Sequence, residues 1–174
     1  FDSADKFATW STLDNSDVPG KTWEFTDSDF AGKPSAFMGP DAGSATCDWL
    51  ISPKFELQEG KTYVIKLDGD TGTDNATSVI LDYFPDSKDK ENAKTIAWIG
   101  SSLPMTDWNT QEPITEWTLE VTKSGSYYFG LRALNSAPNQ EKDAISIYSF
   151  SIEEQPEGEP ETPVTLPYET SFAE

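Results

Sequence analysis

Residues 48–67 read Asp-Trp-Leu-Ile-Ser-Pro-Lys-Phe-Glu-Leu-Gln-Glu-Gly-Lys-Thr-Tyr-Val-Ile-Lys-Leu, and they decide the fold. The first apolar run stops at Pro53, because proline cannot donate a hydrogen bond to a strand ladder. Gly60 then marks a tight turn. After it, Tyr63, Ile65 and Leu67 alternate with Thr62, Val64 and Lys66, which is the period of a strand with one buried face. The stretch predicts a strand, a proline stop, a turn and a second strand.

Working outward from this stretch, the same alternation recurs along most of the chain. Turn signals such as Pro19-Gly20 and Ser124-Gly125 separate the apolar runs. The candidate strands are residues 22–26, 49–52, 62–67, 78–84, 95–99, 117–122, 127–133 and 144–152. We expect no more than one helical turn, within residues 5–13. About eight strands at this spacing predict an all-β fold, a two-sheet antiparallel sandwich.

The last candidate strand changes phase. Ile145 and Ile147 share one face, whereas Tyr148, Phe150 and Ile152 continue with the opposite parity. A one-residue slip moves every later side chain to the other face of a sheet. We therefore predict a β-bulge near Ile147 and Tyr148.

Length and charge limit the possible partners. The 174 residues are enough for one domain, and 31 acidic against 12 basic residues give a net charge of −19. Nucleic-acid binding requires clustered Lys and Arg, and Arg132 is the sole arginine. An anionic membrane surface would repel the chain, and no apolar run is long enough for insertion. We expect neither nucleic acid nor membrane as a partner.

The residue inventory argues against catalysis. Histidine is absent, so a Ser or Cys nucleophile lacks its usual base, and Cys47 alone cannot build a thiolate metal site. Cys47 is most simply a small buried hydrophobe. A pair of carboxylates for glycoside hydrolysis would leave no local signature, so a glycosidase domain stays as a third reading. We therefore expect the chain to be no enzyme.

Sugars stack on exposed aromatic rings, and this directs attention to a few residues. Trp23, Trp49 and Trp117 lie on inward strand phases, and with Trp10 we expect them to be structural. Trp108 differs, because it stands in a polar stretch that does not require a large ring. The ligand-binding candidates are therefore Trp108, Trp98, Tyr83 and Arg132. A loop tryptophan such as Trp108 more often folds over an open sandwich edge than binds a ligand. Arg132 is first of all a candidate for a structural ion pair, and as the only guanidinium it could alternatively hold a ligand carboxylate.

Trp49 to Pro53, followed by Gly60 to Leu67, resembles the core motif of cleaved-adhesin and choice-of-anchor jelly-roll domains. These domains are similar to carbohydrate-binding modules and occur in tandem on bacterial surface and secreted proteins. The resemblance implies a galactose-binding-like jelly roll that acts outside the cell or on the bacterial surface. It implies a non-catalytic module that recognises carbohydrate or a host extracellular protein. A structural spacer repeat without a ligand is the main alternative.

Composition divides the chain into three parts. Residues 1–153 form the expected jelly-roll domain, and residues 154–165 form an acidic, proline-spaced linker. Residues 166–174 become apolar again and resemble the opening strand of a following adhesin repeat. We expect residues 166–172 to dock on the domain in cis, or to exchange as a strand between molecules. Chance similarity is the alternative.

Two acidic stretches are candidates for Ca²⁺, which prefers six to eight oxygen ligands. Asp14 and Asp17 resemble the acidic loop between the flanking tryptophans of the family, although the usual alternating Asp spacing is broken. Asp68, Asp70 and Asp74 form the second stretch, which lacks the downstream glutamate of an EF-hand. The family often ends on an acidic pair where this chain has Tyr148-Ser149, so we expect a weakened site. Solvated turns are the alternative for both stretches.

Overall fold

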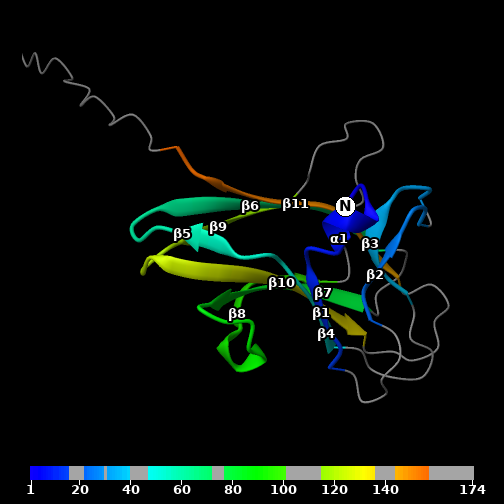
Figure 1. The fold of residues 1–174 in the computed structure, drawn as a ribbon, viewed down its shortest axis with the longest axis horizontal. Helices are drawn as coiled ribbons and strands as arrows, with labels where there is room; N and C mark the ends of the chain where they lie inside the picture. The colour runs from blue at the N-terminus through cyan, green and yellow to red at the C-terminus, as the bar shows by residue number, and fades with distance from the viewer. Residues whose placement is uncertain are drawn as a thin grey trace, which may run out of the picture.

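The computed structural model describes residues 1–15, 22–29, 31–39, 47–71, 77–100, 115–135 and 144–156. Two antiparallel sheets are packed face to face (Figure 1), which confirms the predicted sandwich. The elements are α1 (Ala4–Phe7), β1 (Ser11–Leu13), β2 (Glu24–Thr26), β3 (Ser35–Met38), β4 (Cys47–Ile51), β5 (Phe55–Leu57), β6 (Thr62–Thr71), β7 (Thr77–Pro85), the 3-10 turn η1 (Lys90–Asn92), β8 (Lys94–Gly100), β9 (Thr115–Glu120), β10 (Gly125–Asn135) and β11 (Ile145–Glu154).

One sheet, here called sheet A, has the strand order β1-β4-β10-β7-β8, with β5 also paired to β10. The other, sheet B, has the order β2-β3-β11-β6-β9. All eight predicted strands are present, with ends shifted by a few residues. The sequence did not reveal β1, β3 and β5, because three or four residues are too few to display an alternation.

The Ser-Pro break in the quoted stretch allows two short strands to share one neighbour. β4 ends at Ile51, and β5 resumes the pairing with β10 at Phe55. Between them, Ser52 donates its N–H to the Phe129 carbonyl at 2.8 Å. The Ser52 hydroxyl accepts the Phe129 N–H at 2.8 Å and donates to the Pro53 carbonyl at 2.8 Å. Serine thus satisfies the backbone groups of β10 where proline interrupts the strand.

The turn at Gly60 carries the chain from sheet A to sheet B. Gly60 has a φ of 77°, in the left-handed region that favours glycine. Its N–H donates to the Val121 carbonyl at 2.8 Å, which fixes the turn against the end of β9. The turn therefore switches sheets and does not close a hairpin.

The main core lies between the sheets. Ile65 and Leu67 of β6 are buried as the alternation predicted, opposite Phe129 and Leu131 of β10. Trp23 is also buried there, whereas Trp10 and Trp117 pack at its border. Burial of such side chains contributes roughly 1.5–3 kcal/mol each and is the main stabilising term.

A second apolar cluster lies on the outer face of sheet A, around Trp49, Ile51 and Phe84. Trp49 is buried as expected. The prediction that it faces the inter-sheet core is wrong, because its neighbour Leu50 faces that core. An alternation with one buried face does not apply to β4, because the outer face of sheet A is also covered. Gly130 makes the cluster possible, because a Cβ there would come within 2.6 Å of Phe84 Cε2.

The chain between β7 and β8 covers part of this outer face. Ala93 packs on the cluster, and Lys88 donates to the Ser11 hydroxyl at 2.7 Å. The Lys88 ammonium also lies 5.1 Å from the centre of the Tyr128 ring. Burial lowers the pKa of Lys88. This cover explains why Trp49 and Phe84 are buried on a face that would otherwise be exposed.

The predicted β-bulge in β11 is confirmed. The pairing with β6 passes from Ile147 opposite Gly69 to Ser149 opposite Asp68, so Tyr148 is the extra residue. The bulge returns the later side chains of β11 to the core, where Phe150 and Ile152 pack at its border. Among the described residues, no helix is long and apolar enough to cross a membrane.

Candidate functional site

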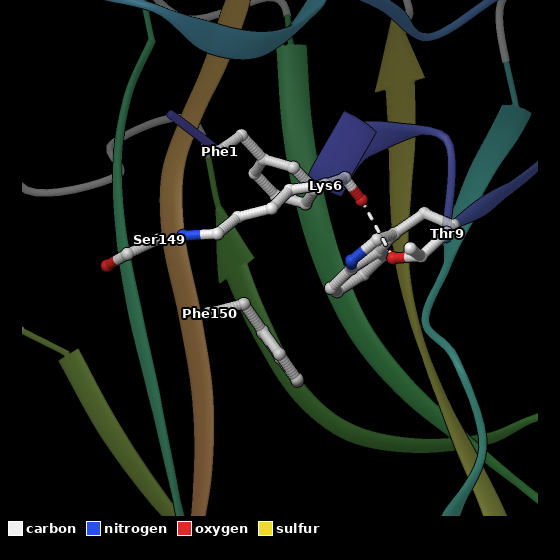
Figure 2. A pocket seen from close by; sticks show the side chains of 6 residues that line it. Phe1, Lys6, Thr9, Ser149 and Phe150 are labelled. Carbon is white, nitrogen blue, oxygen red and sulfur yellow. Dashed lines mark hydrogen bonds between the residues drawn. The ribbon is translucent and has the colours of Figure 1, made fainter. Parts of the chain in front are cut away.

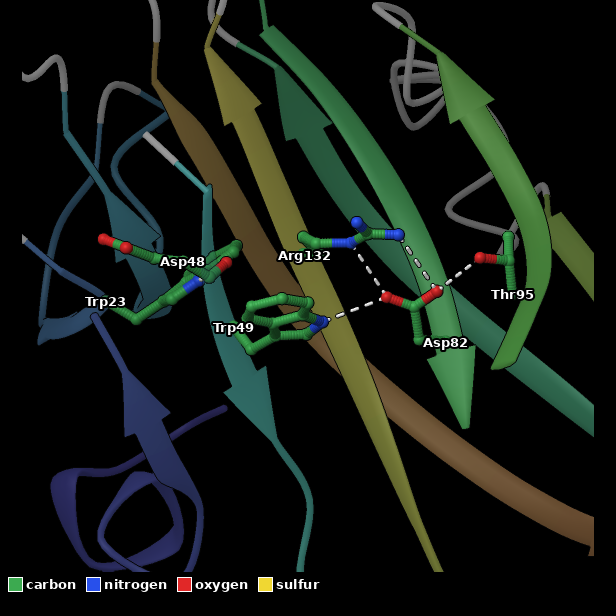
Figure 3. A network of polar contacts seen from close by, with 6 residues as sticks. All are labelled: Trp23, Asp48, Trp49, Asp82, Thr95 and Arg132. Carbon is green, nitrogen blue, oxygen red and sulfur yellow. Dashed lines mark hydrogen bonds and ion pairs between the residues drawn. The ribbon is translucent and has the colours of Figure 1, made fainter. Parts of the chain in front are cut away.

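A buried carboxylate organises the outer face of sheet A (Figure 3). Asp82 on β7 is fully buried, and both of its oxygens accept hydrogen bonds. Oδ2 accepts from Trp49 Nε1 at 3.0 Å and from Arg132 Nε at 3.0 Å. Oδ1 accepts from the Thr95 hydroxyl at 2.8 Å and from Arg132 Nη2 at 3.4 Å. Four donors from three strands therefore compensate the burial of this charge.

Strand register creates the network. Arg132 on β10 stands opposite Trp49 on one side and Ile80 on the other. Asp82 stands opposite Gly130, two residues along β10, so its carboxylate is a diagonal neighbour of Arg132. The guanidinium carbon lies 5.1 Å from the centre of the Trp49 ring. Stacking and the two-point ion pair together hold the arginine in one orientation.

Arg132 remains partly open, with 23% of its side chain exposed. A guanidinium has five N–H donors, and Asp82 accepts from its Nε and Nη2. No other acceptor for these donors lies within the described part of the chain. The remaining N–H groups of Arg132 can therefore donate to a ligand, while the positive charge of the guanidinium is balanced by Asp82.

Arg132 lies near one end of sheet A. β10 and β8 end there, and β4 and β7 begin there, as their antiparallel pairing requires. The connecting residues 40–46, 72–76, 101–114 and 136–143 lie outside the described residues. Binding residues are often carried by loops at one end of a rigid sandwich. We call this the loop-bearing end of sheet A.

The predicted ligand-binding residues are only partly brought together. Trp98 on β8 pairs with Ile80, so its backbone shares a row of the sheet with Arg132. The side chain of Trp98, like the whole of Trp108, lies outside what the structure describes. The Tyr83 ring stacks on Tyr127 with centroids 6.1 Å apart and packs against the main core. Arg132 forms the structural ion pair that the sequence suggested.

The acidic candidates divide between the two sheets. Asp14 follows β1 and is exposed, whereas Asp68 and Asp70 lie on β6 in sheet B. Asp17 and Asp74 lie outside the described residues. Within the described ranges, no three acidic or thiol side chains converge in a way that could hold a metal ion.

Tyr148 and Ser149 stand where the resemblance led us to expect an acidic pair. Burial, with Asp29, Asp70 and Asp68 nearby, raises the pKa of Tyr148 well above its usual value. The Lys33 ammonium lies 4.8 Å from the centre of the Tyr148 ring. A neutral phenol and an ammonium thus occupy a neighbourhood rich in carboxylates.

A separate pocket of about 280 Å³ opens beside the N-terminal turn (Figure 2). Three of its six lining residues are aromatic, with the ring of Trp10 4.9 Å from that of Phe1 and 5.3 Å from that of Phe150. Lys6 contributes a positive charge and is paired with Asp2 at 2.7 Å. The lining residues are Phe1, Lys6, Thr9, Trp10, Ser149 and Phe150.

Solved structures that resemble this chain include β-sandwich adhesin domains and carbohydrate-binding modules. The K1 cleaved adhesin domain of Lys-gingipain from Porphyromonas gingivalis W83 matches with a TM-score of 0.56 and 12% identity, over 85% of this chain and 92% of that one. The K3 domain of the same protein matches with 0.56 and 15%, over 84% and 91%. TmCBM61, determined with β-1,4-galactotriose, matches with 0.52 and 12%, over 86% and 91%.

No protein-family model and no curated protein sequence matches the chain. The structural likeness confirms the jelly-roll sandwich fold of adhesin domains and carbohydrate-binding modules that the motif at Trp49 suggested. At these identities the likeness concerns the fold alone.

Sequence reasoning missed Asp82, the residue that organises the outer face. The signal was a single carboxylate inside an otherwise apolar strand, between Leu81 and Phe84. A buried charge of this kind requires a partner. Its partner could not be named, because the pairing of β7 with β10 is not readable from the sequence.

Proposed function

We propose that the chain is a non-catalytic binding module of an exported protein, outside the cell or on the bacterial surface. Its ligand is a neutral glycan bound at the loop-bearing end of sheet A. The observation that supports this most is Arg132, which is oriented by Asp82 and Trp49 and keeps 23% of its side chain exposed. Arginine held in this way donates to sugar hydroxyls in a defined geometry.

Charge favours a neutral glycan over an acidic one. Asp82 neutralises the guanidinium, so Arg132 offers hydrogen bonds and little net positive charge. The net charge of −19 also repels polyanions from the whole surface. Aromatic stacking would come from Trp108 or Trp98, because Trp49 is only 5% exposed and cannot act as a platform.

A glycan array with neutral and uronate-containing oligosaccharides tests the proposal, with β-1,4-galactotriose included. We expect binding to neutral chains and a weaker signal after Arg132→Lys, which keeps the charge and loses the two-point geometry. Trp108→Ala should cost about 1–3 kcal/mol of binding, by analogy with aromatic stacking on bases. Lys54→Ala is the matched control, because Lys54 lies at the opposite end of sheet A and pairs with Glu56 at 2.7 Å.

Other outcomes of the same array distinguish the alternatives. If no glycan binds, a spacer repeat or a module for a host extracellular protein becomes the better account. A spacer should also be unaffected by Trp108→Ala in every binding assay. Release of reducing sugar from a polysaccharide panel would favour the glycosidase reading, which no described group of residues supports at present.

We also propose, as a separate point, that Ca²⁺ binds the acidic loops only if Asp17 or Asp74 completes a site. Asp14, Asp68 and Asp70 do not make one by themselves. Thermal unfolding in excess EDTA and in millimolar calcium tests this. A ligand specific for the folded state adds about 2.7 kcal/mol at a hundredfold excess over its Kd. An unchanged melting temperature would mean that neither acidic stretch binds calcium.

A further inference from the structure

The two sides of β11 are paired to different extents. On one side, β6 pairs with nearly the whole strand, up to Glu154. On the other side, β3 pairs only with Ile145, Ser146 and Ile147. In the part of the chain that the structure describes, no strand lies beside the second half of β11 on that side. Figure 1 shows this half of β11 continuing beyond the reach of β3. We call it the open edge.

The direction of the backbone groups on the open edge can be worked out. Gln155 donates its N–H to the Thr62 carbonyl of the neighbouring β6 at 2.8 Å. Backbone groups of successive residues point to alternate sides of a strand. The N–H and C=O groups of Phe150, Ile152 and Glu154 therefore point to the open edge. Tyr148 follows the same alternation, because its carbonyl accepts a hydrogen bond from the backbone nitrogen of Phe1 on the open side.

The side chains along the open edge are also incompletely covered. Ile145 and Ile147, which have strands on both sides, are 0% exposed. Phe150 and Ile152 point to the same core but are only partly buried. Phe55, on the facing edge of sheet A, is partly buried as well. The aromatic pocket at Phe150 lies at one end of this border. A missing strand would explain all of these exposures.

Residues 164–172 have the composition of such a strand. The even positions are Val164, Leu166, Tyr168, Thr170 and Phe172, which are apolar apart from Thr170. The odd positions are Thr165, Pro167, Glu169 and Ser171, which are polar or proline. This is the period of a strand with one buried face. Proline is accepted in an edge strand only where its nitrogen faces away from the neighbour.

Two independent requirements select the same residues. In a hydrogen-bonded antiparallel pair, opposed residues direct backbone groups at each other and side chains to the same face. A strand bonded to Phe150, Ile152 and Glu154 must therefore bond through the residues that point into the core. In residues 164–172 these are the even positions, four of which are apolar and one of which is Thr170, and the nitrogen of Pro167 then faces outward. The opposite parity would bury Glu169 and place proline against β11.

We propose that residues 164–172 add to the open edge of β11 in the same molecule, as an antiparallel strand. Residues 155–163 provide a nine-residue connection, which is more than an antiparallel hairpin requires. Such a hairpin runs from Glu154 back to Phe150, because the Tyr148 carbonyl already accepts a hydrogen bond from Phe1. The strand ends near the aromatic pocket, which is large enough for a ring such as that of Phe172. The inference does not depend on the proposed glycan site.

Residue-resolved amide hydrogen exchange on the full chain tests the proposal, with adjacent residues as internal controls. The amides of Ser151 and Glu153 face β6 and should be protected in any case. The amides of Ile152 and Glu154 should be protected to a similar degree, because they donate to the added strand. Exchange of Ile152 and Glu154 at the rate of an unstructured chain would overturn the proposal.

A pair of substitutions checks the identity of the occupant. Thr170→Pro removes an N–H that faces β11, whereas Ser171→Pro removes one that faces outward. We expect Thr170→Pro to accelerate exchange at Phe150 and Ile152 by about tenfold or more, and Ser171→Pro to have little effect. Equal effects of the two substitutions, or none, would show that residues 164–172 are not the strand at this edge.

The mass in solution separates the same molecule from a second copy. The proposal requires a monomer whose exchange at Ile152 is independent of concentration. A dimer whose protection falls on dilution would contradict it and indicate strand exchange between molecules. A glycan array on the Thr170→Pro variant should be unchanged, so failure of this inference is distinguishable from failure of the glycan proposal.

Discussion

The long strands β10 and β11 lie in equivalent central positions of the two sheets, but they are covered differently. β10 has β7 on one side, and β4 followed by β5 on the other, so its pairing runs from Gly125 to Asn135. β11 has β6 on one side, but β3 covers only its first three residues on the other. Phe129 of β10 is accordingly 0% exposed, and Phe150 of β11 is partly exposed.

The difference shows what the Ser-Pro break achieves. It allows one continuous segment to cover β10 twice, with Ser52 bridging the gap. Sheet B has no comparable device in the described residues, so the second half of β11 depends on another segment. The fully paired sheet presents an ordered side-chain network, and the incompletely paired one presents an edge.

The largest expected effect contrasts two phenylalanines whose ring centroids are 6.0 Å apart. Phe129→Ala should destabilise the fold by about 3–5 kcal/mol, since a fully buried aromatic ring leaves a cavity. Phe150→Ala should cost roughly half of that, because part of its ring already meets solvent. Urea unfolding of both variants measures the difference. Equal losses would mean that β11 is as well covered as β10.

The next effect concerns the outer face of sheet A. Arg132→Met should cost about 3 kcal/mol, because it leaves the fully buried Asp82 without its charged partner. Adding Asp82→Asn should recover part of this loss. A double-mutant cycle in urea measures the coupling. Additive losses would show that the ion pair contributes nothing to stability.

A smaller effect is expected where β10 is most tightly packed. Gly130→Ala places a Cβ 2.6 Å from Phe84 Cε2 and 3.0 Å from Trp49 Cδ1. Neither ring has free space to move into, so the substitution should cost about 1–3 kcal/mol. Ser149→Ala on β11, which is exposed, is the control and should change stability by less than about 0.5 kcal/mol. If Gly130→Ala left the free energy of unfolding unchanged, the outer cluster would be shown to repack easily.

The smallest effect lies near the bulge where β11 changes from double to single pairing. Asp29 Oδ1 accepts the N–H groups of Ala31 and Lys33 at 2.8 and 3.0 Å. Burial, the largest single influence, raises the pKa of Asp29, but the Lys33 N–H and the other donors around the carboxylate together lower it. Asp29→Asn should therefore cost on the order of 1 kcal/mol at pH 7.

The pH dependence of this loss has a defined sign. A lowered folded-state pKa stabilises the fold above the ordinary Asp value of about 3.9, and the contribution disappears as the pH falls through the lower folded value. The difference between wild type and Asp29→Asn in urea should therefore shrink between pH 7 and acid. A difference independent of pH would mean that the charge of Asp29 is not what stabilises this turn.

The sequence predicted the sandwich, the proline stop and the bulge, because each rests on local parity or on the chemistry of a single residue. It could not show that Trp49 is buried on the outer face, because that requires the residues between β7 and β8 to fold over sheet A. It could not join Asp82 to Arg132 either, because their contact depends on the register of β7 against β10. Tyr83 was expected among the binding residues, and its inward position follows from the same register.

The proposed glycan site can be tested directly through the sole arginine of the chain, which makes its Nε–H signal in an NMR spectrum unambiguous. Neutral oligosaccharides, β-1,4-galactotriose among them, would be titrated into the full chain while this signal is followed. We predict a saturable shift of the Arg132 Nε–H and of the amides at the ends of β8 and β10, with β11 unchanged. No shift with any neutral glycan, or shifts confined to β11, would contradict a binding site at the loop-bearing end of sheet A.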